Sequence, residues 1–203
     1  MFCMLMRKHL SGAKLIGIEQ FGLERILHLS FSTYNDLGDP VTLKLAVEIM
    51  GRHSNIILIG EDGRIVDSIK RVTEEMSSVR QVLPGMYYEF PPAQDKLSPL
   101  EPDFAELERR LTNGPARPLS KALLEHLDGV SPIVCRELSF RAAGDLDPIC
   151  GELSETQKER LREAIGALGD SVKTGSAVPY MVCDPEGRPM DFTFLDVRQY
   201  GDG

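Results

Sequence analysis

The run Glu48-Ile49-Met50-Gly51-Arg52-His53-Ser54-Asn55-Ile56-Ile57-Leu58-Ile59 indicates how the first half of this chain folds. Apolar residues lead into the run and out of it, and its centre is the polar sequence Gly-Arg-His-Ser-Asn. This pattern predicts two antiparallel strands, Thr42–Met50 and Ile56–Ile59, that are joined by a turn rich in hydrogen-bond donors. Arginine offers a planar fork of donors and glycine lets the backbone come close, so the turn could bind an anion. A solvated hairpin turn without any ligand accounts for the same residues.

Sequence on both sides extends this pair of strands into a larger antiparallel sheet. Apolar runs predict further strands at Leu15–Phe21, Arg25–Ser32 and Arg64–Ile69. The last of these follows Glu61-Asp62-Gly63, in which glycine supplies the positive φ that a tight hairpin turn needs. A short amphipathic helix is expected over residues 2–10, before the first strand.

Prolines separate this sheet from a second half with helical periodicity. Pro91-Pro92, Pro99 and Pro102 block both helices and central strands, which places the boundary near residue 98. Asp184-Pro185-Glu186-Gly187 predicts a hairpin near the end of the chain. Helices are expected over Phe104–Leu111, around Leu119–Leu127, from Ser131-Pro132 onward and from Ser154 to Gly169.

The expected architecture is α+β. A β-rich antiparallel domain takes residues 1–98, a helical domain takes residues 99–175, and a C-terminal β-hairpin takes residues 176–203. Of the 203 residues, 42% are hydrophobic, which is enough to build cores of this size. No apolar run has the length of a membrane span, and Arg7-Lys8 interrupts the opening residues before they could form a signal peptide. The four cysteines lack C-x-x-C spacing, which indicates reduced thiols in a cytoplasmic protein.

Negative charge is concentrated in the second half of the chain. Residues 1–96 hold 11 Lys and Arg against 12 Asp and Glu, whereas residues 97–203 hold 12 against 19. A polyanion is therefore expected to bind the first half, although the net charge of the chain is −8. Scattered surface cations are the alternative, and Tyr87 and Tyr88 could either stack on bases or pack onto the sheet. The residues expected to contact RNA are Arg7, Lys8, Arg52, His53, Ser54, Asn55, Lys70, Arg71 and Arg80.

The sequence contains no recognisable catalytic or metal-binding motif. None of its four histidines is spaced at i, i+4 from another histidine or from a cysteine. No G-x-S-x-G, P-loop or G-x-G-x-x-G run occurs. His53 lies in a polar loop, but as a catalytic base it would need an orienting carboxylate. We therefore expect no enzyme activity, no cofactor and no metal.

The segment Leu127–Leu138 resembles a helix-hairpin-helix, a motif in which successive backbone N–H groups form a nest for a phosphate. Two positions depart from the motif, because Ser131 stands where a second glycine is usual and Ile133 stands where a cation is usual. Acidic residues also flank the turn, Asp128 among them. Simple packing between two helices is the alternative explanation.

Blocks in the first half closely resemble the NFACT proteins, whose bacterial members are often labelled fibronectin-binding protein A N-terminal domain. The blocks are Met1–Leu10, Ile18–Ile26, Glu48–Leu58, Arg80–Gly85 and Pro91–Lys96. The resemblance implies a first domain that looks like the N-terminal domain of formamidopyrimidine-type DNA glycosylases, without their chemistry. A DNA-repair relative would need an N-terminal proline or lysine nucleophile, and this chain opens Met1-Phe2. Family members begin with several strands before the segment that matches Met1 and continue into a coiled coil, so we expect either a fragment or a misassigned gene start.

The resemblance also implies a function. Such proteins bind large ribosomal subunits obstructed by a peptidyl-tRNA, recruit tRNA (alanyl-tRNA in bacteria) and direct C-terminal tailing of the stalled nascent chain. In the family, an Asp-Arg pair after Gly-Leu serves tRNA recognition, and here that position reads Gly22-Leu23-Glu24-Arg25. Glu24 and Arg25 are therefore the expected tRNA-binding pair, with a carboxylate one methylene longer than the family's. The family label suggests an alternative, a surface adhesin that binds fibronectin, which would require export without a signal peptide.

Overall fold

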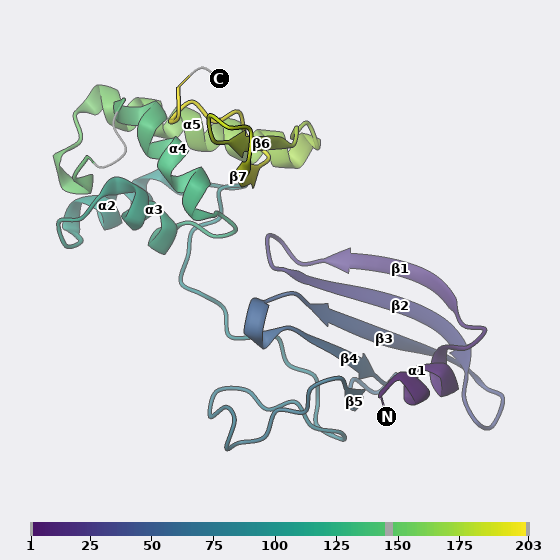
Figure 1. Cartoon of the computed structure of the whole chain (residues 1–203). Helices are drawn as coiled ribbons and strands as arrows, with labels where there is room; N and C mark the ends of the chain where they lie inside the picture. The colour runs from purple at the N-terminus through teal and green to yellow at the C-terminus, as the bar shows by residue number, and fades with distance from the viewer. Residues whose placement is uncertain (1, 145–147, 202–203) are drawn as a thin grey trace. The chain divides into compact units, whose positions relative to one another are not determined.

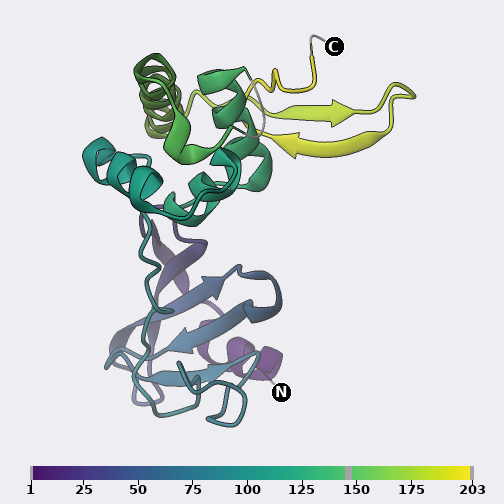
Figure 2. The same ribbon diagram turned by 90° about the vertical axis from the view of Figure 1, so that its left-hand side faces the viewer.

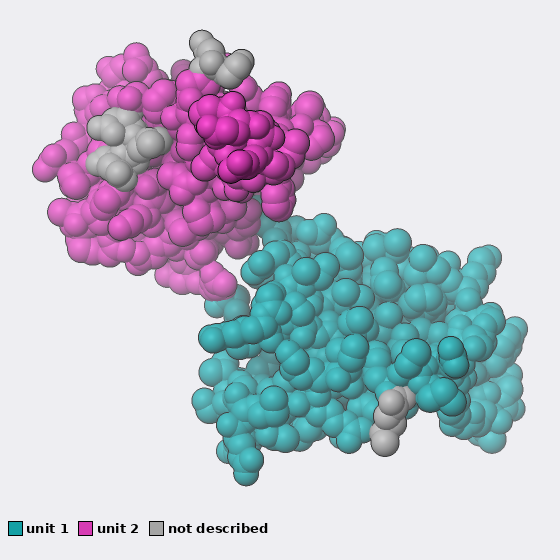
Figure 3. Space-filling view, viewed as in Figure 1, with its two compact units in different colours: residues 1–93 teal, residues 94–203 magenta. Residues whose placement is uncertain are grey.

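The computed structural model describes residues 2–144 and 148–201 (Figure 1). The chain forms two compact units, Met1–Ala93 and Gln94–Gly203, which are coloured separately in Figure 3. Each unit has its own hydrophobic core. The C-terminal hairpin belongs to the same unit as the helices.

The second unit begins ahead of the boundary expected at residue 98, because the backbone of Leu97 is bonded to the helical unit. The Leu97 N–H donates to the carbonyl of His126 over 2.7 Å. The Leu97 carbonyl accepts from the N–H of Asp128 over 2.9 Å. These two bonds attach the start of the second unit to the end of its second helix.

The first unit contains a five-stranded antiparallel sheet in the strand order β1-β2-β3-β4-β5, as its apolar runs predict. Each strand pairs with the next one along the chain, so short turns connect them. The strands are β1 (Lys14–Gln20), β2 (Ile26–Tyr34), β3 (Pro40–Glu48), β4 (Asn55–Ile59) and β5 (Ile65–Ser68). The expected antiparallel sheet is confirmed, and its implied likeness to DNA glycosylases stays a prediction.

The two faces of the sheet are covered by different parts of the chain. On one face, the amphipathic helix α1 (Phe2–Leu10) packs its apolar side chains against Leu43, Leu45 and Leu58. On the other face, side chains of the irregular segment after β5 pack against a cluster that includes Ile57. Because side chains alternate between the faces of a strand, β4 buries apolar residues on both sides. This explains why β4 is an unbroken apolar run rather than an alternating one.

In the described part of the second unit, four α-helices surround one apolar core, and a two-stranded hairpin projects from them (Figure 2). The expected C-terminal hairpin is confirmed. Val182 and Phe194 pack against the helical core at its base, whereas Phe192 is 83% exposed. The elements are α2 (Phe104–Asn113), α3 (Leu119–His126), α4 (Pro132–Ala143), the 3₁₀ turn η2 (Cys150–Glu152), α5 (Glu155–Thr174), β6 (Tyr180–Cys183) and β7 (Pro189–Thr193).

Helix α5 does not end at Gly169, where the sequence suggested a stop. It continues to Thr174 and ends at Gly175, which takes a φ of 64°. Gly169 serves close packing instead, because a Cβ built there would lie 2.2 Å from the carbonyl oxygen of Pro99. Glycine therefore lets this helix approach a backbone segment that no side chain would allow.

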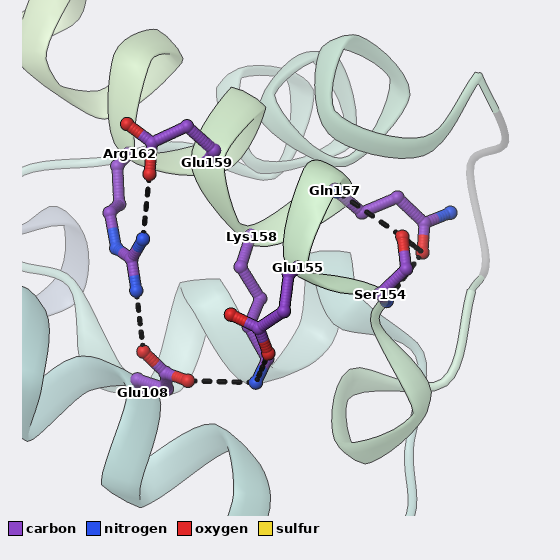
Figure 4. A network of polar contacts seen from close by, with 7 residues as sticks. All are labelled: Glu108, Ser154, Glu155, Gln157, Lys158, Glu159 and Arg162. Atoms are coloured by element: carbon purple, nitrogen blue, oxygen red, sulfur yellow. Dashed lines mark hydrogen bonds and ion pairs between the residues drawn. The ribbon is translucent and has the colours of Figure 1, made fainter.

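Polar contacts fasten α5 to α2 and define where α5 begins (Figure 4). The carboxylate of Glu108 accepts hydrogen bonds from Lys158 over 2.8 Å and from Arg162 over 2.7 Å. These two hydrogen bonds lower the pKa of Glu108. Ser154 and Gln157 form the capping box that their spacing predicts, so the backbone N–H groups of both residues are satisfied at the start of α5.

Candidate nucleic-acid interface

One end of the five-stranded sheet brings together loops that are far apart in the sequence (Figure 1). In an antiparallel sheet, the end of one strand lies beside the start of the next. The turn before β2, the 3₁₀ turn η1 (Gly51–His53) and the residues after β5 therefore meet at this end. The strand register supports this placement, because Glu48 at the end of β3 lies opposite Ile26 at the start of β2 and opposite Asn55 at the start of β4. The cationic end, as this surface is called below, consists of Glu24, Arg25, Arg52, His53 and Lys70.

Arg52, His53 and Lys70 form its centre. Gly51 takes a φ of 56°, which allows the tight turn that presents the next two residues. Arg52 Nε donates to His53 Nε2 over 2.9 Å, and Lys70 Nζ donates to the carbonyl of Arg52 over 2.8 Å. All three side chains belong to exposed residues. Among the described residues no acceptor takes the other guanidinium N–H groups of Arg52, so they can bind an anion.

Asn55 and Ser54 hold this arrangement together from inside. Asn55 is 4% exposed, and its Nδ2 donates to the carbonyl of Lys70 over 2.8 Å. Its Oδ1 accepts from the N–H of Lys70 over 3.1 Å. Ser54 Oγ accepts from the N–H of Met50 over 2.9 Å and so closes η1. The buried amide of Asn55 thus positions Lys70, and a contact of Asn55 with RNA stays a prediction.

Glu24 and Arg25 follow a turn that the backbone holds in place. The N–H of Glu24 donates to the carbonyl of Phe21 over 3.0 Å, and the carbonyl of Glu24 accepts from the side chain of Gln20 over 3.1 Å. The carbonyl of Arg25 accepts from the N–H of Ile49 over 2.8 Å. The Arg25 side chain is exposed, and within the described residues neither it nor the Glu24 carboxylate forms an ion pair. Both charged groups therefore remain available to a ligand.

Two of the arginines expected to contact RNA are occupied by carboxylates. Arg71 donates from Nε and Nη2 to Asp67, each over 2.9 Å, and these hydrogen bonds lower the pKa of Asp67. Arg80 donates to the buried carboxylate of Glu48 over 3.0 and 2.7 Å and to the carbonyl of Glu89 over 2.8 Å. Only 13% of the Arg80 side chain is exposed. Arg80 therefore holds the covering segment to the sheet, and its contact with RNA stays a prediction.

Arg7 and Lys8 lie away from the cationic end. Lys8 Nζ donates to Asp36 over 3.2 Å, and Asp36 belongs to the turn between β2 and β3 at the opposite end of the sheet. Arg7 precedes Lys8 on α1 and is exposed. The basic residues of the first unit therefore do not form one continuous strip.

The turn between α3 and α4 does not present a free phosphate nest. Gly129 takes a φ of 66°, but its N–H donates to the Oδ1 of Asp128 over 2.8 Å. The N–H of Asp128 itself donates to the carbonyl of Leu97 over 2.9 Å. A carboxylate thus occupies an amide that a phosphate would need. The helix-hairpin-helix stays a prediction.

Four aromatic rings pack together beside the cationic end, a cluster that sequence reasoning missed. Phe21 lies edge-on to His28 and to Phe90, with ring centroids 4.8 Å apart in each pair. Phe90 stacks on His28 at 5.3 Å, and Tyr88 lies edge-on to His28 at 5.3 Å. His28 is 5% exposed, and burial lowers its pKa. A signal was present in the sequence, since both phenylalanines directly precede a turn-forming Gly or Pro.

Other site types are not found in the part of the chain that the structure describes. Among residues 2–144 and 148–201, no group of three or more His, Cys, Asp and Glu side chains is arranged to hold a metal ion. No described helix combines the length and the apolar character needed to cross a membrane.

Curated relatives share both units of this chain. Rqc2 homolog RqcH of Bacillus subtilis (strain 168) is 47% identical over 143 residues, which cover 70% of this chain and 25% of that protein. The archaeal Rqc2 homolog aRqcH of Methanocaldococcus jannaschii is 28% identical over 202 residues, which cover 98% of this chain and 28% of that protein. The chain thus spans about a quarter of the length of these relatives.

Solved structures agree with the fold. The fibrinogen binding protein from Staphylococcus aureus matches with a TM-score of 0.73 at 28% identity, covering 100% of this chain and 69% of that one. The N-terminal part of the fibronectin/fibrinogen-binding protein from Streptococcus suis matches with a TM-score of 0.69 at 28% identity, covering 98% and 64%. The family described as NFACT N-terminal and middle domains matches residues 1–203. Because this match extends over both units, the chain belongs to the NFACT family.

Proposed function

We propose that this chain is the RNA-binding part of a ribosome quality-control factor. Such a factor acts in the cytoplasm, binds obstructed large ribosomal subunits and recruits tRNA, with alanyl-tRNA as the candidate, for C-terminal tailing of the stalled nascent chain. The observation that carries the proposal is the cationic end, where three loops bring unpaired donors of Arg25, Arg52 and Lys70 to one end of the sheet. Membership in the NFACT family and similarity to proteins named Rqc2 homologs support it.

The centre of the cationic end suits the RNA backbone. Arg52 presents a guanidinium whose remaining N–H groups can bind two oxygens of one phosphate, and Lys70 adds a second charge. Asn55 fixes the backbone of Lys70 through two hydrogen bonds, so the two cations are held next to each other before any ligand binds. Prior ordering of this kind lowers the entropy cost of binding.

Glu24 and Arg25 suit the reading of a base. Arginine can bond in a bidentate manner to a guanine edge or to a phosphate, and a carboxylate can accept from a base amino group. Such pairs discriminate between bases by roughly 1–3 kcal/mol per contact. The two residues follow a turn that is fixed by backbone hydrogen bonds, which gives the pair a defined place.

The salt dependence of tRNA binding tests the phosphate contacts. Each contact that is lost should reduce the slope of log K against log salt by about 0.7–0.9, because fewer counterions are released. The double variant Arg52→Ala/Lys70→Ala is expected to bind labelled tRNA more weakly and with a smaller slope. Lys14→Ala, an exposed cation at the opposite end of the same sheet, serves as the control and should keep the wild-type slope. Equal slopes in all three proteins would place the RNA surface elsewhere.

The proposed reading of a base by Glu24 and Arg25 has its own test. Arg25→Ala should weaken tRNA recruitment and tailing in the complete protein while co-sedimentation with the large ribosomal subunit persists. Glu24→Asp restores the shorter carboxylate and should keep or raise tailing if the family geometry is the better fit. Unaltered tailing in Arg25→Ala would mean that the pair does not read tRNA.

A fibronectin-binding surface adhesin is the second candidate. Two similar solved structures favour it, since one is called a fibrinogen binding protein and the other a fibronectin/fibrinogen-binding protein. Cell fractionation combined with ribosome co-sedimentation separates the two functions. Protein found with the large subunit, and no retention on immobilised fibronectin, would support the ribosomal role, and the reverse pattern would support the adhesin.

A further inference from the structure

We propose that Phe21 and Phe90 form a stacking platform for one unpaired RNA base beside Glu24 and Arg25. The platform rests on the RNA-binding function proposed above and adds a base-stacking contact to the charged contacts. It would let the protein distinguish single-stranded RNA, in a loop or at an end, from a continuous duplex.

The two phenylalanine rings are exposed and yet held in place. Phe21 is 38% exposed and Phe90 is 45% exposed, although large apolar side chains are usually more deeply buried. They contact each other edge to face at a centroid distance of 4.8 Å and an interplanar angle of 73°. Behind them, His28 stacks on Phe90 with an interplanar angle of 21°. Rings that are ordered before binding lose little conformational entropy when a base arrives.

Both rings belong to the end of the sheet where the charged pair lies. The carbonyl of Phe21 accepts the N–H of Glu24 over 3.0 Å, so the ring and the carboxylate leave the same turn. Phe90 follows Glu89, whose carbonyl accepts from Arg80 over 2.8 Å. Arg80 in turn is bonded to Glu48 at the end of β3. These contacts place aromatic surface next to the charged residues of the cationic end.

An RNA base fits this combination better than an apolar protein side chain does. The patch consists of aromatic rings, and Arg25 follows the turn that carries Phe21. Base stacking on aromatic side chains joined to a cationic track for the backbone is the usual way in which proteins bind single-stranded nucleic acid. A base that stacks on Phe21 or Phe90 would carry its phosphates toward the cationic end.

The ring beneath the platform supplies an independent observation. Among the described residues, Nε2 of His28 is the one buried side-chain nitrogen or oxygen without a hydrogen-bond partner. Buried polar atoms are nearly always satisfied in finished cores, and exceptions tend to mark functional positions. The unsatisfied nitrogen lies in the aromatic cluster, directly behind the ring of Phe90.

A fluorescent base tests the platform directly. The probe is a short single-stranded RNA that carries 2-aminopurine at each position in turn, with the same RNA annealed to its complement for comparison. The chain has no tryptophan, so the emission of 2-aminopurine can be read without interference from it. Stacking should quench that emission at one position when wild-type protein binds the single strand, and the duplex should bind more weakly.

The variants separate stacking from charge. Phe21→Leu and Phe90→Leu should abolish the quenching and weaken single-strand binding about tenfold, because stacking on an aromatic ring is lost. The slope against salt should stay at the wild-type value, since no phosphate contact is removed. Phe21→Tyr and Phe90→Tyr keep the ring and should retain the quenching, which guards against a folding defect. Phe192→Leu removes an exposed ring from the hairpin and is the matched control.

The outcomes also distinguish this proposal from the function on which it rests. If Arg52→Ala/Lys70→Ala lowers the salt slope while both leucine variants bind and quench as wild type does, RNA binding stands and the platform is refuted. If the leucine variants weaken single-strand and duplex binding equally, the contact is not a stacked base and the platform is again refuted. If wild-type protein binds no RNA, both proposals fail together.

Discussion

The guanidinium of Arg80 forms two hydrogen bonds, of 3.0 and 2.7 Å, with the carboxylate of Glu48, which is 2% exposed. Glu48 ends β3, whereas Arg80 lies in the irregular segment that covers one face of the sheet. The hydroxyl of Tyr88 donates to the same carboxylate over 3.0 Å. Burial raises the pKa of that phenol well above its ordinary value, so it stays a donor. The negative charge of the buried Glu48 is thereby compensated by Arg80, and the covering segment is bonded to the sheet.

Removal of one partner of this ion pair should unfold the first unit more easily. Arg80→Ala leaves the buried Glu48 carboxylate without its counter-charge, and we expect a loss of about 3–5 kcal/mol in the free energy of unfolding. The double variant Glu48→Leu/Arg80→Met removes both charges and should recover most of that loss. Urea denaturation measures the free energy of unfolding of both variants. Lys8→Ala breaks an exposed ion pair and should cost only about 0–1 kcal/mol, so similar losses in Arg80→Ala and Lys8→Ala would contradict the prediction.

Two glycines of α5 should respond to the same substitution with opposite signs. Gly169→Ala would place a Cβ 2.2 Å from the carbonyl oxygen of Pro99, so the helix must shift. We expect a loss of about 1–3 kcal/mol, as for other overpacked cores. A Cβ at Gly166 meets nothing within 4 Å, so Gly166→Ala should stabilise the helix by about 0.5–1 kcal/mol. Thermal unfolding of the two variants tests this prediction. Unfolding midpoints that both rise or both fall relative to wild type would show that the close approach of Pro99 to Gly169 is unimportant.

The stability of the first unit should depend on pH through His28. Burial lowers the pKa of His28, Lys44 lowers it further, and Glu19 and Glu48 oppose these effects. Both folded and unfolded chains hold a neutral imidazole above the ordinary value of 6.5. Below that pH the unfolded chain gains a proton before the folded chain does, so stability falls with falling pH until the folded pKa is reached.

Replacement of the imidazole tests this dependence. His28→Phe keeps an aromatic ring among its neighbours and removes the titrating group, so its urea midpoint should fall less than that of wild type between neutral and mildly acidic pH. If the urea midpoints of the two proteins change in parallel with pH, groups other than His28 cause the pH dependence.

The buried carboxylate of Glu137 should hold the chain that follows the hairpin. It is 0% exposed, accepts from the backbone N–H groups of Arg198 and Gln199 over 2.9 and 3.1 Å, and accepts from Arg141 over 2.7 Å. Glu137→Gln weakens these charge-assisted bonds and should cost about 1.5–3 kcal/mol. Hydrogen exchange should accelerate at the amides of residues 198 and 199. Glu163→Gln, at an exposed position on α5, is the control and should leave that exchange unchanged.

The antiparallel sheet and the capping box were predictable because each depends on residues close together in the chain. The apolar strands around Gly51 pair across a short turn, and Ser154 reaches Gln157 within one helical turn. Arg25, Arg52 and Lys70 could be named as candidate contacts from their residue types and from the family resemblance. Their convergence at one end follows from the strand register, which the apolar pattern specifies only in part.

Gly169 and Arg80 show the limit of such reasoning. In sequence, a glycine near the end of a helical pattern indicates the end of the helix. Gly169 instead lies inside α5, and glycine is needed there because the carbonyl of Pro99 lies so close. From its residue type alone, Arg80 is expected to be an exposed surface cation. Its guanidinium is instead largely buried, because it donates to the carboxylate of Glu48, 32 positions earlier in the chain. Local patterns determine the kind and order of the elements, since they act through the nearest few residues. Whether a charged side chain meets solvent, a ligand or a buried partner is decided only when distant segments pack, because the cost of burying a charge depends on all its neighbours.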